Sequence, residues 1–136
     1  MVTQRTLRAR LGTVLIVGHI VAGCLAGVLM TVDRLTMDDL WMTLVLLGPL
    51  FLTYLPSVLH RFVGQPVAET SPEVSVEQYR VSMGFSIVVF VLALAIIGYK
   101  GFGSVTPTNY YLLLGALESF AGFGVGVATR AAFGES

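Results

Sequence analysis

Charged residues are scarce in this chain of 136 residues: 12% are Asp, Glu, Lys or Arg, whereas 55% are hydrophobic. A soluble domain of this length needs far more polar surface, because a small domain has a high surface-to-volume ratio. Basic residues are not in excess either, because eight basic residues face eight acidic ones. The composition therefore argues against a soluble domain and against a nucleic-acid partner.

Cysteine is nearly absent as well. The single Cys24 excludes an intrachain disulfide and any cysteine-pair redox or metal site. The residues before Cys24 are similar to a bacterial lipoprotein signal, but residues 25–32 stay apolar where a cleaved lipoprotein needs a polar tether. We therefore expect Cys24 to be a small residue in a helix interface.

Long apolar runs take up most of the chain. Residues 11–32, 40–59 and 81–99 carry no charge, and residues 101–129 carry only Glu118. Each run is long enough to cross about 30 Å of hydrocarbon as a helix that rises about 1.5 Å per residue. The sequence thus predicts an all-α membrane protein of one domain, a bundle of four transmembrane helices in a lipid bilayer.

Capping patterns predict where three of the helices begin. Thr36 with Asp39 and Ser75 with Gln78 match the capping box, and Thr106 precedes a proline. Ser71-Pro72 is a competing start for the third helix. We expect helices at about 8–32, 37–59, 75–99 and 107–131, with a loop over 60–74.

Basic residues predict the orientation in the membrane. Two of them, Arg34 and Lys100, flank the short connections between the paired helices. The other six lie at the termini or beside the long loop: Arg5, Arg8, Arg10, Arg61, Arg80 and Arg130. Because Lys and Arg are enriched on the cytoplasmic side, we expect both termini and the long loop in the cytoplasm, with the helices in a bacterial inner (plasma) membrane.

Small residues indicate where helices approach one another. The first helix carries Gly18 and Ala22 in one row and Gly23 and Gly27 in another; the fourth carries Gly115, Ser119, Gly122 and Gly126 along one face. Close backbone approach through small residues is a main source of helix association in lipid. Packing within one bundle accounts for one such face. The other face predicts a homo-oligomer or contact with other membrane subunits.

Glu118 is the main polar group expected inside the membrane. It follows Pro107 by eleven residues, which places it near the middle of the bilayer. An ionised acid there costs about 3 kcal/mol, so Glu118 should face protein or water. It is either an ion or proton site, or a neutral, hydrogen-bonded acid that braces a neighbouring helix.

The remaining polar and aromatic residues predict no cofactor and no enzyme. His19 lies inside the first helix and His60 at the end of the second, so their depths do not match those of two haem ligands. No nucleophile, acid pair or metal-ligand pattern indicates catalysis. Tyr110 and Tyr111 fall near a helix end, where aromatic residues typically form a belt at the membrane surface.

One stretch has a more specific pattern. Gly101-Phe-Gly-Ser-Val-Thr-Pro107 is followed by Leu114-Gly-Ala-Leu-Glu118-Ser-Phe-Ala-Gly122. This resembles the filter exit and inner helix of small bacterial members of the potassium-channel superfamily, where a G-Y/F-G-D filter runs into a proline and a helix with an L-x-x-L-E-x-x-x-G pattern. The resemblance implies a pathway for monovalent ions. It would assign the filter positions to Gly101, Phe102, Gly103 and Ser104, and the inner-helix positions to Glu118 and Gly122.

Three functions remain open. The first is a small channel-like protein with the fourth helix beside the ion path; the second is a structural subunit of a larger membrane complex. The third is a small transporter that uses Glu118 as a proton-coupling acid. For residues 101–104 the alternative to a filter is a tight interhelical turn, where glycine supplies the backbone freedom.

Overall fold

Four helices make up almost all of the described chain. The computed structural model describes residues 2–62 and 73–133, and the side chains of 10–49, 51–52 and 75–124. The helices are α1 (Gln4–Thr31), α2 (Met37–Phe62), α3 (Val76–Phe102) and α4 (Pro107–Phe133). Two short strands, β1 (Val2–Thr3) and β2 (Glu73–Val74), pair antiparallel and join the starts of α1 and α3. The predicted all-α class with four helices is confirmed.

Local hydrogen bonds explain where α2 and α3 begin. The Asp39 N–H donates to Thr36 Oγ1 at 3.1 Å, and the Thr36 N–H donates to the Asp39 carboxylate at 3.1 Å. Ser75 and Gln78 form the same reciprocal capping box at the start of α3. Each box satisfies backbone donors that the first helical turn leaves open. The Ser75 start is therefore the one that forms.

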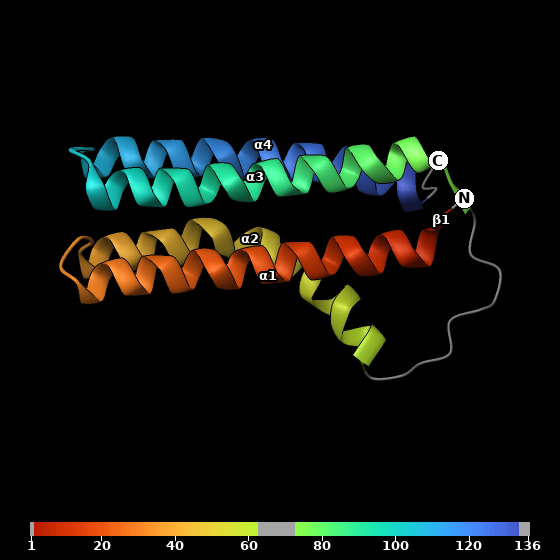
Figure 1. Ribbon diagram of the computed structural model, residues 1–136, viewed down its shortest axis with the longest axis horizontal. Helices are drawn as coiled ribbons and strands as arrows, with labels where there is room; N and C mark the ends of the chain where they lie inside the picture. The colour runs from red at the N-terminus through yellow and green to blue at the C-terminus, as the bar shows by residue number, and fades with distance from the viewer. Residues whose placement is uncertain (1, 63–72, 134–136) are drawn as a thin grey trace.

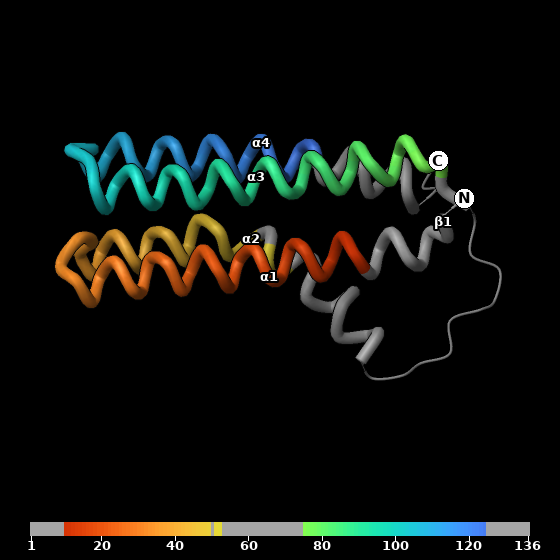
Figure 2. Tube along the Cα trace, in the orientation of Figure 1, coloured from red at the N-terminus to blue at the C-terminus, as the bar shows by residue number. Residues whose placement is uncertain are grey.

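The helices are arranged as two antiparallel hairpins. Figure 1 shows α1 and α2 in one layer and α3 and α4 in the other. α1 packs against α2 and α3, and α4 packs against the same two helices, so the order around the bundle is α1, α2, α4, α3. The start of α1 and the end of α4 lie at one end of the bundle (Figure 1), and the connections 32–36 and 103–106 lie at the other (Figure 2).

Close contact between α1 and α3 depends on glycine at two positions. A Cβ atom on Gly18 would lie 2.4 Å from the ring of Phe90, and a Cβ atom on Gly101 would lie 2.8 Å from Leu29 Cδ1. Between these contacts Ala22 and Ala26 of α1 are fully buried. The small side chains of α1 therefore face the inside of this bundle.

Two helical segments in the described part of the chain are long and apolar enough to cross a membrane: Arg10–Thr31 and Val76–Phe102. Among the charged residues whose side chains the structure describes, Glu118 is the one that lies away from both ends of the bundle. That the four helices cross a membrane, and that both termini are cytoplasmic, stays a prediction.

Candidate functional site

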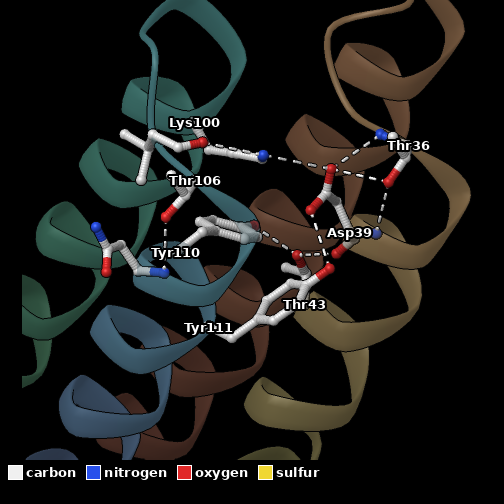
Figure 3. Close-up of polar contacts among 9 residues, drawn as sticks. Thr36, Asp39, Thr43, Lys100, Thr106, Tyr110 and Tyr111 are labelled. Carbon is white, nitrogen blue, oxygen red and sulfur yellow. Dashed lines mark hydrogen bonds and ion pairs between the residues drawn. The ribbon is translucent and has the colours of Figure 1, made fainter.

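A polar cluster joins the two hairpins beside the connections 32–36 and 103–106 (Figure 3). Asp39 of α2 lies at its centre and is only 1% exposed. Its carboxylate accepts hydrogen bonds from Thr36 Oγ1 at 2.9 Å and from the Tyr111 hydroxyl at 3.1 Å. Lys100 Nζ of α3 lies 3.8 Å from the same carboxylate. One acid on α2 thus links α3 and α4.

Two further hydrogen bonds lie in the core, about one helical turn after Asp39 on α2. Thr43 Oγ1 donates to the Asp39 carbonyl at 2.6 Å and also contacts the Tyr110 hydroxyl. Because a threonine hydroxyl has one proton, Tyr110 must be the donor in its bond to Thr43. Both side chains are fully buried, so this pair fixes α2 against α4 inside the core.

The pKa of Asp39 depends on opposing effects of its surroundings in this cluster. Burial raises the pKa of the Asp39 carboxyl, but hydrogen bonds from Thr36 and Tyr111 and the charge of Lys100 together bring that pKa below its usual value. Asp39 precedes the apolar run 40–59, so it lies outside the segment predicted to span the membrane. Lys100 Nζ also donates to the Val105 carbonyl at 3.2 Å. These contacts join α2 to α3 and α4 at one end of the bundle. We call the residues that make them the polar lock: Thr36, Asp39, Thr43, Lys100, Tyr110 and Tyr111.

The end of α3 lies beside this cluster. Gly101 and Phe102 belong to the last turn of α3, and Gly103 and Ser104 begin the connection to α4. The Gly103 N–H donates to the Tyr99 carbonyl at 2.8 Å, which closes the helix three residues later than the sequence patterns predict. The residues predicted as a filter therefore lie at one end of the bundle, two in a helix and two in a short connection.

Glu118 is separated from these residues along α4. It follows Pro107 by eleven residues, which is about 16 Å of helix, and its side chain is half-buried. Within one chain the structure does not bring Glu118 together with residues 101–104.

The predicted packing faces of α1 and α4 have different surroundings. Gly18 and Ala22 lie under α3, as described above, and pack within the chain. Gly23 lies beside Leu44 of α2, and Gly27 has no atom within 4 Å of the position of a Cβ. The first of the two rows on α1 is thus used inside the bundle.

On α4 the small residues lie on the side of the helix that faces away from the core. The core side of this helix consists of Tyr110, Leu114, Leu117 and Ala121. Ser119 and Gly122 are exposed, and Gly115 lies at the boundary next to Leu46. We call Gly115, Ser119 and Gly122 the outer face of α4. Gly126 lies outside the residues whose surroundings are described.

Comparison of the chain with protein-family models, with curated proteins and with solved structures found no match. The similarity of residues 101–122 to the potassium-channel superfamily therefore stays a prediction from short motifs. The candidate site rests on geometry: the polar lock at one end of the bundle and the outer face of α4 with Glu118 beside it.

Sequence reasoning missed the lock. The aromatic-belt prediction gave Tyr110 and Tyr111 no partners, yet Tyr110 is fully buried and Tyr111 donates to Asp39. The capping pattern identified Asp39 only as a local helix signal. No spacing in the sequence relates α2 to α4, so the contact between them could not be read from it.

Proposed function

We propose that this protein is a structural subunit of a membrane assembly, which crosses the bilayer with its four helices and joins its neighbours through the outer face of α4. The proposal places the termini in the cytoplasm and the helices in a bacterial plasma membrane. The outward position of Ser119 and Gly122 is the observation that carries it. The following points support the proposal.

The exterior of the bundle has the character of a lipid-facing surface. Large apolar side chains are exposed on all four helices, among them Ile20, Val45, Val91 and Phe123. Soluble monomers rarely expose contiguous apolar surface of more than a few hundred Å². Arg10 and Arg80 lie at the end of the bundle that holds the termini, as the proposed orientation requires.

The outer face of α4 offers a backbone that a second helix can approach closely. Among the described residues no atom lies within 4 Å of a Cβ on Gly122, so their packing does not require glycine there. In lipid, small residues on a free helix face favour helix–helix contact because they allow van der Waals packing of the backbones. The same face predicts either copies of this chain or other subunits as partners.

Native mass spectrometry after gentle detergent extraction tests this proposal. We expect the chain in a complex of fixed stoichiometry, and we expect Gly122→Leu to release it as a single bundle because leucine blocks the close approach. Gly84→Leu is the matched control, since Gly84 is an exposed helix glycine of α3 that likewise has no atom within 4 Å of a Cβ. A wild-type chain that is already a lone bundle contradicts the proposal, and so does equal dissociation of both variants.

A channel-like homo-oligomer is the second candidate, and the position of Glu118 favours it. Glu118 precedes Ser119 on α4 and is half-buried, so it lies at the edge of the outer face. In a symmetric oligomer built on that face, the Glu118 side chains of all copies lie near the contact, about midway through the bilayer. Acidic side chains at that depth commonly mark pathways for cations or protons.

Ion flux into liposomes separates the two candidates. A channel-like oligomer passes monovalent cations, and Glu118→Gln lowers the flux while the oligomer in native mass spectrometry stays intact. Liposomes that stay silent over several monovalent ions and voltages exclude the channel and leave the structural subunit. An unchanged flux in Glu118→Gln excludes a role of this acid in the path.

A further inference from the structure

A groove between α1 and α2 contains a buried histidine nitrogen without a hydrogen-bond partner. The groove has a volume of about 370 Å³. Its lining residues come from both helices and include His19, Ile20, Cys24, Leu44, Gly48 and Phe51. Because Ile20, Cys24 and Leu44 are exposed, the groove opens to the outside of the bundle. It lies on the opposite hairpin from the outer face of α4.

The hydrogen bonds of His19 fix the role of each ring nitrogen. Nδ1 lies 2.6 Å from the Leu15 carbonyl oxygen, and a carbonyl only accepts, so Nδ1 carries the proton. In a neutral imidazole Nε2 is then a bare acceptor. Among the described residues Nε2 is buried and forms no hydrogen bond, because the nearby Leu47 carbonyl is itself an acceptor, and His19 as a whole is only 8% exposed. A buried acceptor without a donor destabilises the fold, so a donor that reaches it is favoured.

The surroundings of the His19 ring are aromatic and apolar. Its centroid lies 5.0 Å from the Phe90 ring in an edge-on arrangement and 5.7 Å from the Phe51 ring in a tilted one. Phe90 lies under the ring on the α3 side, whereas Phe51 is part of the groove wall. Because Nε2 is buried, a ligand in the groove reaches it only when a side chain of the groove wall moves aside.

A water molecule is a poor partner for this site. Buried water needs about two to four polar partners, which is more than His19 Nε2 and the nearby Leu47 carbonyl securely supply. The other side chains of the groove are Cys24, a weak hydrogen-bonding group, and the apolar Ile20, Leu44 and Phe51. A ligand with one hydroxyl group and an apolar body matches the groove better, because its body replaces the apolar contacts and its hydroxyl supplies the missing donor. The absence of a side chain at Gly48 leaves the space for that body.

We propose that this groove binds a lipid-soluble compound with a single hydroxyl donor, such as an alkylphenol, which donates a hydrogen bond to His19 Nε2. The ligand enters from the outer side of the hairpin, where lipid surrounds the helices. This site is independent of the outer face of α4, so it does not rest on the proposed assembly.

Two probes that differ by one hydroxyl test the site. The purified full chain in detergent micelles is titrated with 4-hexylphenol and with hexylbenzene, and binding is measured by calorimetry. We expect the phenol to bind about tenfold more tightly, as one net hydrogen bond of about 1.4 kcal/mol implies. In ¹⁵N-histidine-labelled protein the His19 Nε2 resonance then moves upfield with the phenol and stays in place with hexylbenzene.

Three variants make the test specific. His19→Phe keeps the ring shape and reduces the tenfold preference to about one, whereas His19→Gln keeps an acceptor and retains part of the preference. Gly48→Leu fills the groove and abolishes binding of both probes, since no atom lies within 4 Å of a Cβ at that position to be displaced. Gly84→Leu on α3 leaves both affinities unchanged. The spectra of each variant, compared with those of the wild type, show whether it is folded.

Equal affinities of the two probes for the wild-type chain overturn the proposal. Binding that persists in Gly48→Leu overturns it as well, because the probes then bind elsewhere. A Nε2 resonance that already has the position of a hydrogen-bonded nitrogen without any probe, and does not move with the phenol, assigns the acceptor to water. None of these outcomes depends on whether the chain assembles through α4.

Discussion

Asp39→Asn removes the charge at the point where α2, α3 and α4 meet and leaves the shape of the side chain almost unchanged. The carboxylate accepts from the Thr36 N–H at 3.1 Å, from Thr36 Oγ1 at 2.9 Å and from the Tyr111 hydroxyl at 3.1 Å, and it faces Lys100 at 3.8 Å. An asparagine keeps one acceptor oxygen and turns an NH₂ group toward groups that are themselves donors. The variant therefore keeps the hydrogen bonds of only one carboxylate oxygen, either those from Thr36 or that from Tyr111, and loses the charge that faces Lys100.

The size of the effect follows from these contacts. Hydrogen bonds to a charged group contribute about 1.5–3 kcal/mol each, and neutral ones about 1 kcal/mol. Breaking a fully buried ion pair costs about 3–5 kcal/mol, but Lys100 is 12% exposed and keeps its bond to the Val105 carbonyl, so its share is smaller. We expect Asp39→Asn to lower the free energy of unfolding by about 2–4 kcal/mol and Tyr111→Phe by about 1–2 kcal/mol.

Unfolding of the purified chain in mixed micelles, followed by circular dichroism as the fraction of SDS rises, measures both losses. Asp38→Asn is the matched control, because it makes the same chemical change at an exposed neighbour, and we expect it to change stability by less than about 0.5 kcal/mol. If Asp39→Asn unfolds at the same SDS fraction as the wild type, or if Asp38→Asn is destabilised equally, the polar lock does not hold the hairpins together.

Further predictions concern the helix contacts and the dependence of stability on pH. Gly18→Ala places a methyl group against the Phe90 ring and should destabilise the bundle by about 1–3 kcal/mol. Gly27→Ala has free space at its Cβ and should be neutral or stabilise the bundle by up to about 1 kcal/mol. SDS unfolding of the two variants measures both effects. The pKa of Asp39 is lower in the folded chain than in the unfolded one, so its contribution is complete above about pH 4 and is lost as the pH falls further. Unfolding curves at pH 3 and pH 6 should therefore differ less for Asp39→Asn than for the wild type.

The helix starts could be predicted because they depend on neighbouring residues. Thr36 with Asp39 and Ser75 with Gln78 form their hydrogen bonds within four consecutive residues, so the pattern is visible in the sequence. The all-α class could also be predicted, because the long apolar runs are visible in the sequence itself. The end of α3 was placed at Tyr99 because the apolar run stops before Lys100, but the helix includes Lys100, whose charge is partnered by Asp39 of another helix.

The candidate site was harder to predict because it depends on contacts between helices. The small residues of α1 and α4 were all predicted to pack, but only the structure shows that Ala22 faces the core and that Ser119 faces outward. Tyr110 contacts Thr43, which is 67 residues away, and no local pattern relates the two. The unpaired Nε2 of His19 likewise becomes apparent only when the partners of the ring are known.

Disulfide crosslinking in intact membranes tests most directly whether the outer face of α4 contacts a neighbour. Cys24 is the single cysteine, so a Cys24→Ser background is free of thiols and accepts one new cysteine at a time. Ser119→Cys places that thiol on the outer face of α4, and Val91→Cys places it on the exposed side of α3 as the matched control. We predict that oxidation yields a crosslinked dimer, or an adduct with a cysteine of another subunit, for Ser119→Cys but not for Val91→Cys. Equal crosslinking at the two positions, or none at Ser119→Cys, contradicts assembly through α4.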